Sequence, residues 1–482
     1  MGWRVRMVGA GGFAALLWAA FYPGLSWLAW PALAGLFWVI SGWGAKRGAA
    51  IGALAGFVFF TLTFTSVLQL RPFIGALAIP LWILLAAYAA LYPAVFGAVV
   101  GRWPSPLAWA GAWTLLEMAR ATGPFGVAFG SLPGAMAVPP LVGAAGIGGP
   151  WLLSLAAAWT GACLAARTRG RRLWLALALL GPALLLLGSG VVPDTEQVGT
   201  LRVAVVQTGV PQEQRLDPGQ VPEMMDRYRG LLEGLDEPLD LVVFPESVLP
   251  VPLRTRPEHL EEFKAAARRL NAELLVGTGD LWEGEVYNST LLLDEQGEIV
   301  GLYDKMHLVP FGEYLPARDL WEGAGLDPLL QELLPRDLAH GSRGDPIGRY
   351  GVLICFESQF PALARRSVAQ EAQLLVVPTN DAWFGDNRVL WDHFAFGALR
   401  AAEQGRAFIH ATSTGVTGVF DPAGRLLEKL PLQEPGVLYV ELPLRRGQTP
   451  YGVVGDWPVL GLAVLLVVVG VVWEERGRRS AF

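Results

Sequence analysis

The most constraining feature of the sequence is a series of apolar runs, each about as long as a helix that crosses a membrane. Such a helix needs about 20 mainly apolar residues. Seven runs of this kind precede residue 198 and an eighth lies near the C-terminus, at 5–22, 24–43, 48–68, 76–100, 105–121, 147–166, 173–191 and 457–473. The run at 24–43 is the least secure, because Pro23 and Pro31 interrupt it and a re-entrant hairpin would show the same pattern. The runs predict a multipass α-helical membrane domain of about eight helices.

Charge divides the chain in the same place. Residues 1–198 hold 11 of the 37 basic residues and three of the 43 acidic residues, so the remainder of the chain is acidic and suited to water. An acidic, exposed domain argues against nucleic acid as a partner. We expect a membrane domain with seven helices at 1–198, a water-exposed domain at 199–448, and a final membrane helix with a tail at 449–482. Cys163 and Cys355 allow at most one disulfide, which excludes a disulfide framework.

The basic residues also predict the orientation of the helices, because Lys and Arg collect in cytoplasmic loops. With the N-terminus inside, the loops and tails on the inner side contain Arg4, Arg6, Lys46, Arg47, Arg102, Arg167, Arg169, Arg171, Arg172, Arg476, Arg478 and Arg479. The outer short loops contain Arg71 and little else. Both termini are therefore expected in the cytoplasm and residues 199–448 outside it. No A-x-A-like cleavage site precedes a mature domain, so the first helix is expected to be an uncleaved anchor.

Two ionisable residues lie inside the fifth predicted span. Glu117 and Arg120 are three residues apart and share a helical face. They are either a mutual pair that orients the helix or, since ionisable residues inside a membrane are costly, a functional pair. The following loop, 122–146, is rich in Gly and Pro, carries no charge and contains Phe125 and Phe129. It is either a wall of a lipid access site in the headgroup region or a packed connector.

The water-exposed part has a different periodicity. Short β-branched runs end in polar residues, as in LDLVVFPES, YGVLICFES and AQLLVVPTND, and helical stretches such as 257–270 and 392–405 lie between some of them. This alternation is typical of a layered α/β fold. The continuous apolarity of LVVF, VLIC and LLVV predicts strands buried on both faces, with helices covering the sheet. In such folds the chemistry gathers where strands end.

Three such positions supply reactive groups: Glu246 after LVVFP, Lys305 in a loop, and Cys355 after VLI. A lone cysteine at the end of a buried strand is usually an inert small hydrophobe. Here a polar corner follows it, where a nucleophile can be exposed. A thiol with a pKa of about 8.5 is mostly protonated at neutral pH, so Glu246 can act as its base while Lys305 stabilises the thiolate and an oxyanion. Spacing alone does not bring the three groups together.

Longer motifs contain these residues. The segments FPES (244–247), DKMHLVPFGEYLP (304–316), CFES (355–358) and NDAWFG (380–385) resemble the nitrilase, or carbon-nitrogen hydrolase, superfamily. KMHLVPFGEYLP, NDAWFGD, residues 393–425 and TPYGVVGDWP (449–458) resemble, more narrowly, the apolipoprotein N-acyltransferase family. The resemblance covers the whole chain, since that family also has membrane helices before its nitrilase-like domain and one after it.

The resemblance implies an αββα sandwich. It also implies a catalytic triad in which Glu246 is the general base, Lys305 stabilises the tetrahedral intermediate and Cys355 is the acylated nucleophile. Glu313 matches the family's second carboxylate, which orients the lysine. Glu357 matches a residue important in the family whose chemistry the sequence does not assign. The chain departs from the family pattern at Phe356, where members commonly have tyrosine, and at Leu216, where they often have tryptophan.

The function implied is acyl transfer from a phospholipid, through a Cys355 thioester, to the N-terminal amine of diacylglyceryl-cysteine on an apolipoprotein. The expected setting is the bacterial cytoplasmic membrane, with the catalytic domain on the extracytoplasmic (periplasmic) side and the protein a monomer. Loops 315–335 and 382–391 are either lids that exclude water or packed surface loops. No cofactor is expected. A metal site is disfavoured because the histidines at 259, 307, 340, 393 and 410 form no close ligand pair.

Two other interpretations stay open. A membrane-tethered amidase or nitrilase would use the same triad to hydrolyse a small amide, and a multipass transporter or sensor would carry a degenerate, non-catalytic binding domain. Asn288-Ser289-Thr290 is formally a glycosylation sequon, which we interpret as part of a strand edge without modification.

Overall fold

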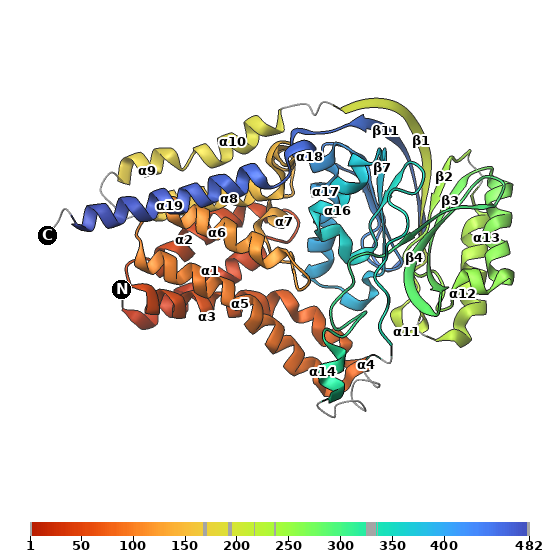
Figure 1. The fold of residues 1–482 in the computed structure, drawn as a ribbon, viewed down its shortest axis with the longest axis horizontal. Coiled ribbons are helices and arrows are strands. Elements are labelled where there is room, and N and C mark those ends of the chain that lie inside the picture. The colour runs from red at the N-terminus through yellow and green to blue at the C-terminus, as the bar shows by residue number, and fades with distance from the viewer. Residues whose placement is uncertain are drawn as a thin grey trace. The chain divides into compact units, whose positions relative to one another are not determined.

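The computed structural model describes residues 2–166, 171–190, 195–215, 217–235, 238–323, 334 and 336–479. They form two compact units (Figure 1). The helical unit comprises Met1–Pro193, Asn387–Glu403 and Thr449–Phe482, and the sheet unit comprises Asp194–Asp386 and Gln404–Gln448. The helix α17 (Arg388–Gln404) comes from the middle of the second half of the chain, yet most of it is grouped with the helical unit.

Each of the eight predicted spans coincides with a helix or with consecutive helices. The elements of the helical unit besides α17 are α1 (Trp3–Ala19), η1 (Ser26–Leu28), α2 (Ala29–Ile40), α3 (Ala45–Thr63), η2 (Phe64–Leu70), α4 (Arg71–Ile74), η3 (Gly75–Leu77), α5 (Ala78–Arg102), α6 (Pro106–Ala121), α7 (Leu132–Met136), η4 (Leu141–Ala144), α8 (Ala145–Ala165), α9 (Arg171–Leu177), α10 (Leu180–Ser189), α18 (Pro450–Val454) and α19 (Trp457–Arg479).

Four segments in the described part of the chain are long and apolar enough to cross a membrane: Ala45–Arg102, Leu141–Ala165, Arg172–Ser189 and Trp457–Arg478. The first has 58 residues and contains two of the predicted spans, and Ser26–Ile40 is a shorter apolar helix. The predicted fold class, a multipass α-helical membrane domain, is therefore confirmed.

Glycines allow α3 and α5 to pack with their backbones close together. A Cβ on Gly52 would lie 2.1 Å from the carbonyl oxygen of Pro93, and one on Gly97 would lie 2.2 Å from the carbonyl oxygen of Gly48. Small residues let membrane helices approach closely, and van der Waals packing then stabilises their association. These glycines therefore fix the pairing of two predicted spans.

Glu117 and Arg120 hold the loop after α6 by separate hydrogen bonds. The Glu117 carboxylate accepts from the Leu132 backbone N–H at 2.8 Å and from the Ser154 hydroxyl. The Arg120 guanidinium donates to the carbonyl oxygens of residues 127 and 129 and to the Ser131 hydroxyl, at 2.5, 2.9 and 2.6 Å. Both side chains thus fasten the loop, and the loop is a packed connector over these residues.

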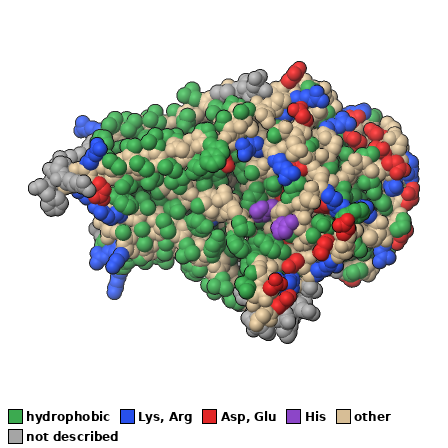
Figure 2. Space-filling view, in the orientation of Figure 1, with side chains coloured by type: hydrophobic (Ala, Val, Ile, Leu, Met, Phe, Trp, Pro, Cys, Tyr) green, Lys and Arg blue, Asp and Glu red, His purple; other side chains and the backbone are tan. Residues whose placement is uncertain are grey.

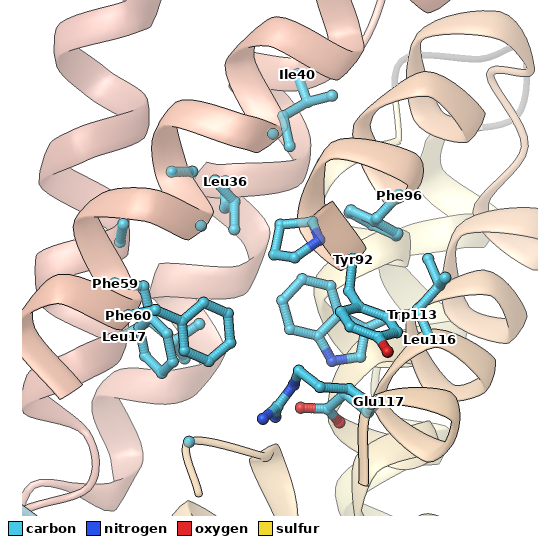
Figure 3. Close-up of a pocket in the computed structure, with 17 residues that line it drawn as sticks. Leu17, Leu36, Ile40, Phe59, Phe60, Tyr92, Phe96, Trp113, Leu116 and Glu117 are labelled. Atoms are coloured by element: carbon cyan, nitrogen blue, oxygen red, sulfur yellow. The ribbon is translucent and has the colours of Figure 1, made fainter. Parts of the chain in front are cut away.

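A cavity of about 50 Å³ lies among α1, α2, α3, α5 and α6 (Figure 3). Its walls are mostly apolar and aromatic, Glu117 lies at one end, and Arg120 is also among the lining residues. The guanidinium carbon of Arg120 also lies 4.9 Å from the centre of the Phe60 ring, which lines the cavity. The volume is enough for about three water molecules.

The described part of the sheet unit contains two sheets. The first has the strand order β11-β1-β2-β3-β4-β5 and the second β10-β9-β8-β7-β6. The strands are β1 (Thr195–Gln207), β2 (Leu241–Val243), β3 (Glu273–Trp282), β4 (Glu285–Leu293), β5 (Ile299–Asp304), β6 (Tyr350–Val352), β7 (Leu374–Thr379), β8 (Phe408–Thr412), β9 (Gly418–Phe420), β10 (Leu426–Lys429) and β11 (Gly436–Gly447).

The two sheets face each other across one apolar core. Leu241, Val243 and Leu275 of the first sheet share a buried cluster with Val352 and Val376 of the second. A second cluster lies between the first sheet and the helices α12 (Val221–Glu233) and α13 (Pro257–Leu270). The helix α16 (Pro361–Ala369) contacts β6 of the second sheet.

The central strands are buried on both faces, as their continuous apolarity predicts: all three residues of β2 and all six of β7 are buried. The remaining helical elements of the sheet unit are α11 (Gln212–Arg215), η5 (Pro218–Gln220), η6 (Leu253–Thr255), α14 (Arg318–Gly323), η7 (Cys355–Gln359) and η8 (Asp381–Phe384). The prediction of a nitrilase-like αββα sandwich is confirmed.

Candidate active site

Glu246 lies three residues after β2 and is 6% exposed. The next residue, Ser247, has a φ of +46°, which turns the chain sharply away from the strand. The buried Arg215 holds this turn, because its Nη2 donates to the carbonyl oxygens of Glu246 and Ser247, each at 2.5 Å. Strand β2 and Arg215 together fix the backbone from which the Glu246 carboxylate projects.

Lys305 directly follows β5 and is 1% exposed. Its ammonium donates to Glu313 Oε1 at 2.8 Å and lies 3.7 Å from Glu246 Oε1. Burial alone would lower the pKa of Lys305, but the charges of Glu313 and Glu246 outweigh it and raise that pKa above its ordinary value. The lysine is therefore a permanent cation between two carboxylates.

Cys355 is the first residue of η7 and has a φ of +51°. Non-glycine residues rarely adopt this left-handed conformation, and where they do it is often at functional sites. Burial of the thiol raises the pKa of Cys355 well above its usual value, and the charge of Glu246 raises it further while that of Lys305 lowers it. The thiol is thus protonated at neutral pH, and both predicted partners act on it electrostatically.

Glu313 anchors the lysine from the loop after β5. Its Oε2 accepts from the Val309 backbone N–H at 2.8 Å, which leaves Oε1 to receive Lys305. The carboxylate is thereby fixed by its own loop. This geometry agrees with the orienting role that the resemblance implies.

Glu357 is fully buried and joins the Cys355 turn to the Lys305 loop. Its Oε1 accepts from the backbone N–H groups of Met306 and His307 at 2.7 and 2.9 Å. Its Oε2 accepts from the Ile354 N–H at 2.7 Å and from the Tyr303 hydroxyl at 2.8 Å. Glu357 therefore positions the segments on either side of it, a role that its place in the sequence did not reveal.

Phe356 packs in an aromatic cluster instead of offering a hydroxyl. Its ring centre lies 5.4 Å from that of Phe360 and 5.9 Å from that of His307. Burial and the neighbouring charges lower the pKa of His307 to about 4, so the cluster is neutral at pH 7. The other departure from the family pattern, Leu216, lies outside the described residues, as does part of the 315–335 loop.

Asn288 and Arg215 contact the site, although the sequence did not point to either. Asn288 of β4 donates from Nδ2 to Glu246 Oε1 at 2.6 Å and to Glu313 Oε1 at 3.2 Å. Arg215 supports the Glu246 turn from a distant part of the chain. Arg215 lies in no motif, and the sequon that begins at Asn288 was interpreted as part of a strand edge without modification.

The structure therefore gathers Glu246, Lys305 and Glu313 into one buried cluster. Cys355 lies close enough to it that the charges of Glu246 and Lys305 shift the pKa of its thiol. The arrangement can take a proton from a thiol with a carboxylate and stabilise an oxyanion with a fixed ammonium. It is suited to attack on an acyl carbon.

This sandwich defines a carbon-nitrogen hydrolase domain, and the family model of that description, "Carbon-nitrogen hydrolase", matches residues 202–451. A second model, "Apolipoprotein N-acyltransferase N-terminal domain", matches residues 13–163 in the helical unit. The chain is 34% identical over 432 residues to the apolipoprotein N-acyltransferase of Azotobacter vinelandii, covering 85% of this chain and 82% of that protein. It is 31% identical over 486 residues to the Geobacter metallireducens protein of the same name, covering 92% and 91%.

The chain belongs to the apolipoprotein N-acyltransferase family. The resemblance inferred from the motifs is thus confirmed, and the apolar helices agree with a membrane protein. Among solved structures, an amidase from Nesterenkonia sp. aligns at 23% identity with a TM-score of 0.39, covering 50% of this chain and 90% of the amidase.

Proposed function

We propose that the protein transfers an acyl chain from a phospholipid to the N-terminal amine of diacylglyceryl-cysteine on an apolipoprotein, through a thioester on Cys355. The name of its relatives supports the reaction class. One structural observation carries the chemistry: Lys305 lies 3.7 Å from Glu246 and both act on the Cys355 thiol, although the three residues are far apart in the sequence.

In the first half-reaction Glu246 takes the thiol proton as the sulfur of Cys355 attacks the ester carbonyl of the phospholipid. The oxyanion that forms is stabilised by Lys305, whose charge Glu313 holds in place. When the intermediate collapses, the C–O bond of the ester breaks and protonated Glu246 gives its proton to the leaving glycerol oxygen. A lysophospholipid departs and the acyl chain stays on sulfur.

In the second half-reaction the free amine of the lipoprotein attacks the thioester carbonyl. Glu246 removes a proton from the nitrogen, the C–S bond breaks, and the proton returns to sulfur as the amide leaves. One carboxylate serves both steps, because it ends the first step ionised. The scheme predicts ping-pong kinetics.

The setting follows from the charge distribution of the loops. We propose that the protein lies in the bacterial cytoplasmic membrane with both termini inside and the sheet unit on the extracytoplasmic side. Both substrates are lipid-anchored, so the membrane helices restrict the search for them to two dimensions. A single chain supplies every residue of the scheme, which is consistent with a monomer.

The decisive experiment is to incubate the purified protein with a labelled phospholipid and to measure its intact mass. We expect one added acyl group, mapped by peptide mass spectrometry to Cys355, in the wild type and in Cys163→Ala. The adduct should be absent in Cys355→Ala. An unmodified wild type, or the same adduct in Cys355→Ala, would remove the mechanism.

A second incubation separates the transferase from a hydrolytic amidase. The acyl-enzyme is offered a diacylated lipopeptide with a free N-terminal amine, and in parallel the same peptide acetylated at that amine. Transfer predicts an N-acylated peptide only in the first case, with loss of the acyl group from Cys355. Release of free fatty acid at the same rate in both cases would instead indicate hydrolysis.

A further inference from the structure

Asn288 lies on β4 beside the lysine of the site. It is 7% exposed, and its backbone carbonyl accepts the Lys305 N–H at 2.8 Å. Strands β4 and β5 are antiparallel, with Ser289 opposite Asp304. The pairing of these strands therefore places Asn288 next to Lys305 without any help from the loops.

The side chain of Asn288 bonds to the same two carboxylate oxygens as the lysine. Its Nδ2 donates to Glu246 Oε1 at 2.6 Å and to Glu313 Oε1 at 3.2 Å. The Lys305 ammonium lies 3.7 and 2.8 Å from those same atoms. One charged donor and one neutral donor thus converge on both carboxylates.

The charges explain why a neutral donor suits this position. Glu246 and Glu313 place two carboxylates around the single cation of Lys305, and like charges held this close together repel each other. An amide with two N–H groups supports both ionised carboxylates without a second cation, which would weaken Glu246 as a base. Arg215 also acts electrostatically on Glu246, but its described hydrogen bonds go to backbone carbonyls.

An asparagine at position 288 also has a cost in folding stability. The Oδ1 atom of Asn288 is buried and has no hydrogen-bond partner among the described residues. An unpaired buried acceptor is destabilising. A purely structural strand position would avoid this cost with an apolar side chain, so the donor group of the amide is the part that the site uses.

We propose that Asn288 is the positioning residue of the general base: it holds Glu246 Oε1, which leaves Oε2 to exchange the proton with the sulfur of Cys355. No hydrogen bond to Glu246 Oε2 is found in the described part of the chain, in keeping with this division between the two oxygens. The proposal rests on the proposed function, since it assigns a role within the same proton transfer.

Three substitutions at Asn288 test this role. Asn288→Ala removes both donor groups, Asn288→Asp keeps the shape but adds a third carboxylate, and Asn288→Ser keeps one small donor. We expect the rate of acyl-enzyme formation to fall about 100-fold in the Ala and Asp variants and less in the Ser variant. The KM for phospholipid should stay within about twofold, because Asn288 supports the base and not the lipid.

The split between rate and KM gives the readout that a structural role would not move. In Asn288→Ala the rate of acyl-enzyme formation should fall while the KM for phospholipid stays, and Asn288→Ser, which restores a donor, should recover part of that rate. Ser289→Ala is the matched control: it removes the hydrogen bond from Ser289 Oγ to Asp304 Oδ1 (2.6 Å) on the neighbouring position of the same strand. It should lower the melting temperature and leave the rate of acyl-enzyme formation within about twofold.

The outcomes separate this inference from the proposed function. If the wild type forms no Cys355 adduct, the proposed function fails. If the wild type forms it and the folded Asn288 variants keep its rate, only the inference is wrong. An equal loss of rate in Asn288→Ala and Ser289→Ala would likewise overturn it. Should Asn288→Asp not fold, the melting temperatures and rates of the Ala and Ser variants decide the question.

Discussion

The nucleophile Cys355 and the residue after Glu246, Ser247, both have strained backbones. Cys355 and Ser247 have φ values of +51° and +46°, and a non-glycine residue in this region costs on the order of 1–2 kcal/mol. A buried ionic side chain holds the chain at each position: Glu357 accepts the Ile354 N–H, and Arg215 donates to the carbonyl of Ser247. The strain is therefore offset by charge-assisted hydrogen bonds, which aim the thiol and carboxylate while keeping their backbones rigid.

The reactivity of the Cys355 thiol should respond in opposite directions to its two charged neighbours. Glu246 raises the pKa of Cys355 and Lys305 lowers it. In a Cys163→Ala background, Glu246→Gln should therefore lower that pKa and speed alkylation by iodoacetamide at pH 7 at least tenfold, while Lys305→Met should slow it. The time course of intact mass measures both rates.

The same Glu246→Gln variant should still lose acylation by phospholipid, because no group remains to protonate the leaving glycerol oxygen. Glu223→Gln, an exposed carboxylate paired with Arg227 on α12, is the control for both assays. Slower alkylation in Glu246→Gln would contradict the electrostatic account of the thiol.

Glu357 should make the acylation rate sensitive to pH near neutrality. Burial raises the pKa of Glu357 to about 7, although all four groups that face it are hydrogen-bond donors and favour its ionised form. As the pH falls through about 7, Glu357 becomes protonated and its O–H faces a hydrogen-bond donor with which it cannot bond. One of the four hydrogen bonds to Glu357 is then lost, so the acylation rate should fall.

Glu357→Gln should imitate that low-pH state at every pH, because its amide nitrogen also meets donors. We expect a loss of about 100-fold in acylation and about 2 kcal/mol in the free energy of unfolding. The pH–rate profile and thermal unfolding in detergent check these values. Glu261→Gln, exposed on α13, is the matched control, and a Glu357→Gln profile that still falls through pH 7 would refute the assignment.

At the scale of elements, the apolar runs predicted the helices well, because the length needed to cross a bilayer is a strict requirement. The breaks within these runs were harder to predict: the predicted run 173–191 is divided between α9 and α10. The strands of the sandwich followed from their apolarity, and α17 was expected as a helix over 392–405. Its grouping with the helical unit could not be predicted, since it depends on contacts such as that of the Asp392 carboxylate with the Gly130 N–H at 2.7 Å.

The active site was also predictable only in part, because its geometry depends on tertiary contacts. Strand ends pointed to Glu246, Lys305 and Cys355, but only the family resemblance joined them, because nothing in the spacing of a chain specifies which strand ends meet. Asn288 remained unnoticed because its role depends on strand register, with Ser289 opposite Asp304. Register is a tertiary property, fixed by which face of a strand is buried.

The α3–α5 contact predicts that a single methyl group destabilises the helical unit. In Gly52→Ala the new Cβ would lie 2.1 Å from the Pro93 carbonyl oxygen, so the helices must separate. We expect a lower melting temperature in detergent, by several degrees. Gly11→Ala on α1, where no atom lies within 4 Å of the added Cβ, should leave it unchanged or slightly higher. Equal effects of the two substitutions would contradict the close packing.

The connector after α6 should depend on the fork shape of Arg120. The guanidinium makes its three hydrogen bonds to residues 127, 129 and 131 from two nitrogens, and a lysine cannot reproduce this geometry. Arg120→Lys should therefore cost about 2 kcal/mol of stability and expose the connector to limited proteolysis near residue 125. Arg71→Lys, at an exposed position, is the control. Wild-type protease resistance in Arg120→Lys would show that the fork is dispensable.

At the scale of the whole molecule, the basic residues assigned to the inner side by the charge rule can be followed through contacts at one end of the helical unit. Arg6 donates to the Ser41 carbonyl at 2.7 Å and lies over the Trp43 ring. A Cβ on Gly101 would lie 2.4 Å from the Gly44 carbonyl, which brings the end of α5 to the same place.

The same end also includes α19. Arg102 pairs with Glu475 at 3.1 Å, and Arg478 donates to the Arg102 carbonyl at 2.5 Å. Figure 2 shows Lys and Arg side chains at the end of the helical unit that carries the chain termini, beside a flank of apolar side chains. Since cytoplasmic loops are the ones enriched in Lys and Arg, this end is the one expected inside the cell.

The orientation can be tested with single cysteines placed at the two ends of α3. In a Cys163→Ala, Cys355→Ala background, the exposed positions Lys46→Cys and Arg71→Cys mark the two ends: Lys46 is in the first turn of α3, and Arg71 begins α4 beyond the other end of α3. A membrane-impermeable maleimide applied to intact spheroplasts should label position 71 and not position 46, and both after permeabilisation. Glu261→Cys, exposed on α13, should label like position 71 if the sheet unit is extracytoplasmic. Labelling at position 46 alone would invert the whole arrangement, because every basic residue traced to that end of the helical unit would then lie outside the cell.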